Sequence, residues 1–348
     1  GGDGGDENTP TATEAPETSG ESTEEPSTST SSEGSGGSDL EFEWTPSRNV
    51  NVIVPWGAGG GTDTMTRGIM NPAEDLLRQN DINVSINVQN ITGAGGLNAT
   101  SYVQSQPANG HTIFANTAVI ERNIVQETAN FSLEDWNAIC RVQHATSWWY
   151  TSGQDGAGYD SIDGVLEKAN NNPPLQIGAT GGGISQVFSL RVAKEAEILD
   201  NVQFVTYDDA GEMRNDVISG ETDIAIGEIQ EMLPQIKSGD VKLVLVGTEQ
   251  DQIDRFADVP TTGDQGWDAT YGVQRGFAAW KGTPSEAVSF WNTLIKAATQ
   301  TESYQQLAEE TLANLRPGYL GPEEWKDAMA NQVEIMNEAQ KLWKQVSG

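Results

Sequence analysis

The sequence predicts an α/β fold of parallel sheets with helices packed on their faces. Short β-rich runs alternate with helical segments through most of the chain, and three of these runs are each followed by a glycine-rich loop and then a helix. Neighbouring parallel strands need a crossover connection, which is usually a helix, so this alternation is typical of a parallel sheet. The length of 348 residues is enough for about two domains.

The composition excludes several classes of protein. There are 19 basic and 51 acidic residues, which give a formal net charge of −32, and such a chain would be repelled by nucleic acids and by anionic membranes. The single cysteine, Cys140, excludes an internal disulfide and a multi-cysteine metal site. No apolar run approaches the roughly 18 residues that span a bilayer. We therefore predict no metal site, no cofactor and no nucleic-acid partner.

Residues 1–43 differ in composition from the rest of the chain. They are almost entirely Gly, Ser, Thr, Pro, Asp and Glu, with 12 acidic and no basic residues. Such a segment buries too little apolar surface to offset its ordering entropy, so we predict a disordered, acidic tether. A lipid-bearing cysteine upstream of Gly1 would anchor it to the cell surface, and a low-complexity tail without an anchor is the alternative.

Acidic residues are also abundant outside this tether. The remaining 305 residues carry 39 acidic and 19 basic side chains, dispersed along the sequence. A dispersed carboxylate surface keeps a protein hydrated when high salt screens its repulsion, and we take it to indicate a halophilic protein. A surface that attracts cations would instead predict clusters of acidic residues, which the sequence does not show.

The first half of the body predicts three strands and their connecting helices. A β-rich run ends at Pro55, and after a glycine cluster a helical pattern begins at about Thr62, with apolar residues spaced by three and four. Pro72 is expected to kink or interrupt this helix. The strands are predicted at 50–54, 84–88 and 112–115.

The second half predicts another set of alternating elements and two closing helices. The closing helices begin at Pro284 and Pro322, where the missing N–H of proline carries no cost. Core packing is predicted for an apolar stripe on the last helix, formed by Trp325, Met329, Val333, Met336 and Trp343. The strands are predicted at 175–179, 202–206, 223–226 and 241–246, and the helices between them at 162–170, 186–196, 213–219 and 231–237.

Three glycine-rich loops are the candidate binding elements. They lie at 55–63, 90–98 and 180–185, each between a predicted strand and a predicted helix. Glycine lets the backbone approach a ligand closely, and the free N–H groups at a helix N-terminus favour an anion. Neither early loop has the Gly-Lys-Ser/Thr ending or the full GxGxxG pattern of nucleotide-binding loops. One such loop is more often a tight turn, but three in the same context predict an anion-binding cleft beyond the carboxyl ends of the strands.

The same loops carry a resemblance to a known family. The run Val52–Asp63, V-I-V-P-W-G-A-G-G-G-T-D, resembles the opening of the substrate-binding proteins of tripartite tricarboxylate transporters, the TctC or Bug family. The second loop resembles that family's N-R-P-G-A-G-G, with Ile91-Thr92 in place of Arg-Pro. With its acidic surface, the chain resembles a haloarchaeal member of the family. Further segments match in family order at 107–117, 177–183, 205–207, 220–226, 258–261 and 282–284, so that the resemblance covers about residues 48–346.

The resemblance implies a two-lobe, type II periplasmic-binding-protein fold with the ligand cleft between the lobes. Residues 44–145 and 250–348 would form lobe 1, and residues 146–249 would form lobe 2. It also implies an extracytoplasmic solute receptor, a monomer without catalytic residues, that delivers a small carboxylate to membrane permease subunits by lobe closure. The carboxylate would be a di- or tricarboxylate or a related organic acid. A receptor that signals to a sensor protein is the first alternative, and an enzyme that uses the glycine loops as an anion site is the second.

The resemblance further implies which residues bind the ligand. Trp56 would cover an apolar ligand body or merely fill a lid. Asp208, Asp209 and Glu228 depart from the family's pattern, and they would either accept a ligand ammonium group or be solvated. The implied binding residues are Trp56, Gly57, Ala58, Gly59, Gly60, Gly61, Asp63, Gly93, Ala94, Gly95, Gly96, Thr117, Thr180, Gly181, Gly182, Ser185, Tyr207 and Glu228.

Several other residues are expected to have structural roles only. His111 starts a strand and His144 precedes a predicted crossover, so neither is expected to act chemically. Cys140 is expected to be a small buried apolar residue. The run Trp148–Tyr150 predicts strand packing in preference to a hinge or a partner surface.

Overall fold

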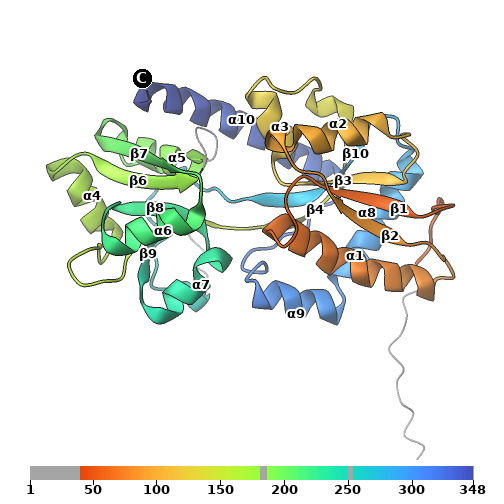
Figure 1. The fold of residues 1–348 in the computed structure, drawn as a ribbon, viewed down its shortest axis with the longest axis horizontal. Coiled ribbons are helices and arrows are strands. Elements are labelled where there is room, and N and C mark those ends of the chain that lie inside the picture. The colour runs from red at the N-terminus through yellow and green to blue at the C-terminus, as the bar shows by residue number, and fades with distance from the viewer. Residues whose placement is uncertain (1–39, 181–185, 250–253, 348) are drawn as a thin grey trace, which may run out of the picture. The chain divides into compact units, whose positions relative to one another are not determined.

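The computed structural model describes residues 40–180, 186–249 and 254–347. These residues form two five-stranded sheets with helices packed against them (Figure 1). The first sheet has the order β2-β1-β3-β10-β4. In this sheet β1 is parallel to β2 and β3, whereas β10 is antiparallel to β3 and β4. Its strands are β1 (Val50–Val54), β2 (Ile86–Asn90), β3 (Thr112–Asn116), β4 (Trp136–His144) and β10 (Gln274–Trp280).

Both faces of the first sheet are buried, and β1 contributes to both. Val52 packs with α1 and α8 on one face, whereas its neighbour Ile53 packs in a second cluster on the other face with Phe114 and Trp325. This is the alternation expected of a strand covered on both sides. The helices and short 3₁₀ segments of this part are α1 (Gly61–Gln79), η1 (Ala94–Gly96), α2 (Leu97–Ser105), α3 (Val119–Val125), η2 (Leu133–Asp135), α8 (Ser285–Thr299) and α9 (Glu302–Glu310).

The second sheet has the order β7-β6-β8-β5-β9. Here β6 is parallel to β7 and β8, and β5 is antiparallel to β8 and β9. Its strands are β5 (Ser147–Ser152), β6 (Leu175–Thr180), β7 (Val202–Tyr207), β8 (Ile224–Glu228) and β9 (Val241–Val246). Its helices and 3₁₀ segments are α4 (Ile162–Asn171), α5 (Val187–Glu195), η4 (Leu199–Asn201), α6 (Ala210–Ser219), α7 (Ile229–Ser238) and η5 (Asp254–Phe256).

Two short segments connect the sheets and pair with each other. The first leads from β4 into β5, and the second leads from Tyr271 into β10. They are joined by hydrogen bonds from the Ala145 N–H to the Val273 carbonyl (2.9 Å) and from the Ser147 N–H to the Tyr271 carbonyl (3.3 Å). These paired segments therefore carry the chain between the two sheets.

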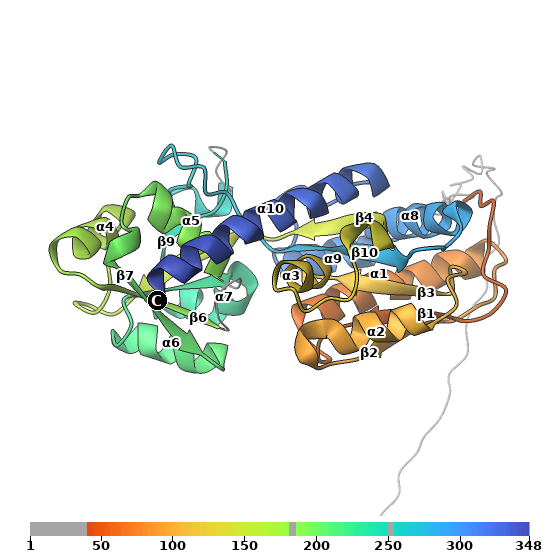
Figure 2. The same cartoon turned by 90° about the horizontal axis from the view of Figure 1, so that it is seen from above.

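The last helix, α10 (Pro322–Val346), runs beside elements of both sheets (Figure 2). Near its start Trp325 packs in a core cluster of the first sheet. Further along, Met336 and Leu342 pack against Val187 and Leu190 of α5. The predicted apolar stripe is confirmed, because Trp325, Met329 and Met336 are at most 2 % exposed and Val333 and Trp343 are partly buried in the same packing.

Most predicted elements are confirmed, with small shifts in their bounds. The largest error concerns α1, which continues through Pro72 without interruption. Proline removes one helical hydrogen bond, but buried residues on both sides of it, including Ile69 and Leu77, hold the helix on the core. The strands β4 and β10 and the helices α3 and α9 were not predicted. Nearly every residue of β4 is buried, so its sequence lacks the alternation that reveals a half-exposed strand.

The residues expected to have structural roles are packed as predicted. Cys140, Trp148 and Trp149 have no exposed surface. His111 is 9 % exposed and its ring meets the Ser47 N–H and Asn109. None of the helices in the described ranges combines the length and the apolar composition needed to cross a bilayer.

The folded body begins before residue 44, where the sequence predicted the end of the tether. Residues 1–39, which make up most of the predicted tether, lie outside the described residues. Leu40, Phe42 and Trp44 pack against the core of the first sheet, and the Phe42 ring lies 4.7 Å from that of Phe290 between centroids. The end of the acidic segment is therefore bound to the body of the protein.

Candidate functional site

A cavity of about 540 Å³ lies between the two sheets. Thr117 follows β3, Thr180 ends β6 and Glu228 ends β8, and all three side chains line this cavity. The carboxyl ends of strands from both sheets therefore meet at one site, as expected for ligand binding in open α/β sheets. We name it the interlobe cavity. Its lining residues also include Trp56, Arg122, Met213, Glu231, Tyr271, Val273 and Arg275.

Some of the predicted binding residues line the interlobe cavity and others do not. Trp56, Thr117, Thr180 and Glu228 line it. The glycines at 59–61 line an adjoining cavity of about 370 Å³, which shares Glu231 and Arg275 with the first. Neither cavity is lined by Gly57, Ala58, Asp63, Gly93, Ala94, Gly95, Gly96 or Tyr207, and Gly181, Gly182 and Ser185 lie outside the described residues.

Asp63 shapes the first glycine loop from inside. Its carboxylate is buried and accepts hydrogen bonds from the Gly59 N–H (2.9 Å), the Asn90 side-chain amide (2.9 Å) and Arg67 (3.0 Å). Burial alone would raise the pKa of Asp63, but these hydrogen bonds and the Arg67 charge outweigh it and lower that pKa. The internal carboxylate thus uses one of the loop N–H groups that we expected to face a ligand.

The second glycine loop packs on α3. A Cβ atom on Gly96, whose φ is +92°, would lie 2.5 Å from a methyl group of Val119. The neighbouring Gly95 carbonyl accepts hydrogen bonds from Arg122 and from the Asn123 side chain. The loop therefore presents an acceptor to α3, and its effect on the interlobe cavity is to orient Arg122.

Arg122 is a candidate functional residue that our sequence reasoning missed. Its guanidinium carbon lies 5.2 Å from the centre of the Trp56 ring and it donates to the Gly95 carbonyl. It forms no ion pair with any residue in the described ranges, and burial lowers its pKa. The sequence did offer a signal for it, because basic residues are scarce, with 19 in the chain. Arg122 is one of them, and it lies on the helix that follows the carboxyl end of β3.

Arg275 and Glu228 join the two sheets through a bidentate ion pair. The Arg275 Nη1 and Nη2 atoms donate to the two Glu228 carboxylate oxygens at 3.0 and 2.9 Å, and these side chains are only 8 % and 13 % exposed. The Gln230 side chain also donates to Glu228. Both Glu228 carboxylate oxygens are thus paired within the protein, an arrangement that neither alternative from the sequence anticipated.

The remaining polar residues near the cavity are held by internal hydrogen bonds. The Thr62 hydroxyl donates to the Thr117 hydroxyl at 3.0 Å. The Tyr207 hydroxyl bonds to Asp216 (2.9 Å) and Thr222 (2.7 Å), which directs it into the second sheet's own packing. Asp209 accepts hydrogen bonds from the Gly211 and Glu212 N–H groups, so its carboxylate acts as the N-cap of α6.

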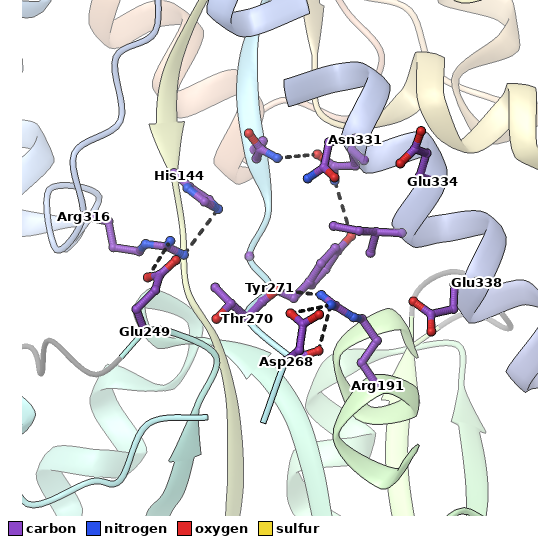
Figure 3. A pocket seen from close by; sticks show the side chains of 14 residues that line it. His144, Arg191, Glu249, Asp268, Thr270, Tyr271, Arg316, Asn331, Glu334 and Glu338 are labelled. Atoms are coloured by element: carbon purple, nitrogen blue, oxygen red, sulfur yellow. Dashed lines mark hydrogen bonds and ion pairs between the residues drawn. The ribbon is translucent and has the colours of Figure 1, made fainter. Parts of the chain in front are cut away.

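A third cavity, of about 470 Å³, lies on the opposite face of the connecting segments (Figure 3). His144 and Gln274 line it, whereas their strand neighbours Gln143 and Arg275 line the cavity of the first glycine loop, because successive side chains of a strand point to opposite faces. Burial and the nearby Arg316 and Arg141 charges lower the pKa of His144 to about 3, which leaves its ring neutral.

The cations of this third cavity have carboxylate partners. Arg316 bonds to Glu249 at 3.3 Å, and Arg191 bonds to Asp268 at 3.2 Å and to two backbone carbonyls. In Figure 3 both guanidinium groups point toward these partners. The interlobe cavity differs, because Arg122 has no carboxylate partner among the residues that the structure describes.

Two α/β lobes joined by a pair of connecting segments, with the cavity between them, define the class of two-lobe periplasmic binding proteins. The model of the tripartite tricarboxylate transporter family receptor, TctC, matches residues 71–319, and the chain belongs to this family. The protein BugT of Bordetella pertussis is 24 % identical over 270 residues, which cover 74 % of this chain and 78 % of BugT. Members of this family are solute-binding receptors.

Several solved structures share the fold. A TctC solute-binding protein from Polaromonas has a TM-score of 0.71 at 20 % identity, over 84 % of this chain and 98 % of that protein. The Rhodopseudomonas palustris protein Rpa4515, solved with adipate, has a TM-score of 0.69 at 19 % identity, over 86 % and 98 % of the two chains. MatC from the same organism, solved with malate, has a TM-score of 0.62 at 20 % identity, over 87 % and 100 %. These relatives are bacterial, and they do not bear out a haloarchaeal likeness.

Proposed function

We propose that this protein is an extracytoplasmic solute receptor that binds a small organic acid through a carboxylate group. It delivers this ligand to the membrane permease subunits of a tripartite tricarboxylate-type transporter. The observation that carries the proposal is Arg122, a cation without a carboxylate partner among the described residues, which lines the interlobe cavity. The ligands named for Rpa4515 and MatC, adipate and malate, are both small carboxylates and support the same class.

A local cation is needed because the protein as a whole repels anions. The formal net charge is −32, so attraction to a carboxylate must come from short-range contacts within the cavity. Burial has removed part of the water around Arg122, and a charge-assisted hydrogen bond there is worth about 1.5–3 kcal/mol. The Trp56 ring and the Gly95 carbonyl already hold the guanidinium in place, which reduces the ordering cost of binding.

The residues that line the cavity come from both lobes, which supports lobe closure around a ligand. Arg122 of α3 and Thr117, which follows β3, lie with the first sheet, whereas Thr180 of β6 and Met213 of α6 lie with the second. A ligand that contacts both groups binds the closed arrangement better and shifts the population toward it. The paired segments around Ala145 and Val273 would act as the hinge between the lobes. Lobe 2 would then extend beyond the predicted boundary at residue 249, because Ala269 and Tyr271 pack with the core of the second sheet.

The acidic composition and the N-terminal segment complete the proposal. Residues 1–43 would act as a tether from a lipid anchor upstream of Gly1, and the receptor would work as a monomer on the cell surface. The dispersed acidic residues would keep it hydrated in a saline environment. We also propose roles for the glycine loops, in which the first lines the cleft and the second orients Arg122.

A ligand screen by thermal shift and calorimetry tests the proposal. Purified protein in molar KCl is titrated with mono-, di- and tricarboxylates, aromatic acids and amino acids. A ligand at about 100 times its dissociation constant raises the unfolding free energy by about 2.7 kcal/mol. Arg122→Gln should abolish this effect, whereas Arg78→Gln, on the exposed side of α1, should retain it. Absence of binding by every carboxylate, or full binding by Arg122→Gln, would contradict the proposal.

A further inference from the structure

The ion pair between Arg275 and Glu228 forms part of the wall of the interlobe cavity. Both side chains line it, and Arg275 also lines the adjoining cavity of the first glycine loop. The Arg275 Nη2 atom lies 3.0 Å from the position that a Cβ atom of Gly61 would occupy. A protein cation with its own carboxylate therefore occupies the start of α1, where a ligand anion would otherwise be expected.

The charges that line the interlobe cavity balance before any ligand enters. Arg122 and Arg275 are positive, and Glu228 and Glu231 are negative. Residues 181–185, which follow Thr180 in the sequence and lie outside the described ranges, contain no ionisable side chain. Because Glu228 neutralises Arg275, Arg122 is the one cation among the described lining residues that is left for a ligand.

We propose that Glu228 determines the specificity of this receptor, because by neutralising Arg275 it restricts the cavity to ligands with a single carboxylate, which pairs with Arg122, and disfavours dicarboxylates. This inference rests on the proposed function, in which the ligand is a small organic acid. It narrows that class to monocarboxylates with an uncharged remainder.

A second ligand carboxylate would have to compete with Glu228 for Arg275. Glu228 is part of the same chain, accepts both guanidinium hydrogen bonds at 2.9–3.0 Å and is 13 % exposed. Displacing it would leave a poorly hydrated carboxylate without its partner, which is strongly unfavourable. A dicarboxylate that left the pair intact would place its second charge beside Glu228 and Glu231, and like charges at this range repel.

The test compares acids that differ only in the number of carboxylates. Calorimetry gives dissociation constants for hexanoate against adipate and for butyrate against succinate, in the wild-type protein and in Glu228→Gln. We expect the wild-type protein to prefer the monocarboxylate of each pair. Glu228→Gln frees Arg275 for a second carboxylate and should shift the ratio toward the dicarboxylate by about tenfold or more.

Two further variants distinguish the effect of freeing Arg275 from the effect of removing one negative charge from the cavity. Glu231→Gln removes an equal charge from the same cavity without freeing Arg275, so it should shift the ratio much less. Adding Arg275→Gln to Glu228→Gln removes the freed cation and should cancel the shift.

Each outcome decides the inference. Preference of the wild-type protein for dicarboxylates would overturn it without any variant. An unchanged ratio in Glu228→Gln, or an equal shift in Glu231→Gln, would also overturn it while leaving the proposed function intact. Failure of the wild-type protein and the variants to bind any carboxylate would overturn the proposed function itself.

Discussion

The guanidinium carbon of Arg122 lies 5.2 Å from the centre of the Trp56 ring. Trp56 follows β1 and Arg122 belongs to α3, so the contact joins the ends of two elements on the same side of the first sheet. An aromatic face attracts a cation without neutralising its charge, so Arg122 is held in position and can still pair with a ligand carboxylate.

Replacing Trp56 should weaken ligand binding while leaving the fold intact. The side chain is only half-buried, so Trp56→Leu should change the unfolding free energy little. The lost cation–π contact is worth about 0.5–2 kcal/mol, which predicts an affinity roughly two to thirty times lower. Calorimetry with the best ligand from the screen measures this change. Trp56→Phe keeps an aromatic face and should recover part of the affinity, and equal losses in the two variants would contradict the role given to the ring.

Replacing Gly96 should destabilise the second glycine loop and disturb Arg122. A Cβ atom there would lie 2.5 Å from Val119, and the φ of +92° is unfavourable for any residue with a side chain. We expect Gly96→Ala to lower the unfolding free energy by about 1–3 kcal/mol, as overpacking does, and to weaken ligand binding because Gly95 orients Arg122. Urea unfolding together with calorimetry measures both effects.

Gly164→Ala is the matched control for that substitution. Gly164 lies inside α4, and its nearest neighbour would be 3.7 Å from the new Cβ atom. An alanine fits there and suits a helix better, so this variant should gain about 0.5–1 kcal/mol of stability. Equal stability of Gly96→Ala and the wild-type protein would show that the loop is not packed as described.

The strand and helix pattern was largely predictable from the sequence, because it depends on local spacing. The spacing of apolar residues and the glycine-rich turns between them predict the bounds of β1, α1 and β3 to within a few residues. The element β4 was missed because Trp136–His144 is almost wholly buried and carries no alternating signal.

The candidate site was less predictable, because its charges are set by contacts distant in sequence. The glycine loops correctly indicated the region, but Glu228 meets Arg275 across 47 positions, and nothing local marks either as a partner of the other. Arg122 likewise depends on Trp56 and Gly95, which approach it only in the folded chain. A pattern of residues can thus locate a cleft while leaving its charge balance undetermined.

The buried carboxyl group of Glu121 should make stability depend on pH. Its side chain has no exposed surface and accepts hydrogen bonds from the Asn116 amide at 2.9 and 3.1 Å. Burial raises the pKa of Glu121 from its ordinary value of 4.5 to about 7, and the Asn116 hydrogen bond offsets only part of this effect. The folded protein therefore binds a proton that the unfolded chain releases between these two values.

Because the folded protein holds this proton more tightly than the unfolded chain does, its stability falls as the pH rises. The contribution of Glu121 to stability is fully present below pH 4.5 and is lost as the pH rises through about 7, with a total change of up to about 3 kcal/mol. Glu121→Gln cannot ionise, so above neutral pH it should be more stable than the wild-type protein, and the difference should vanish in acid. Denaturant unfolding across this pH range, at constant KCl concentration, measures it. The exposed Glu127→Gln should follow the wild-type profile, and a difference between Glu121→Gln and the wild-type protein that does not vary with pH would contradict the assignment.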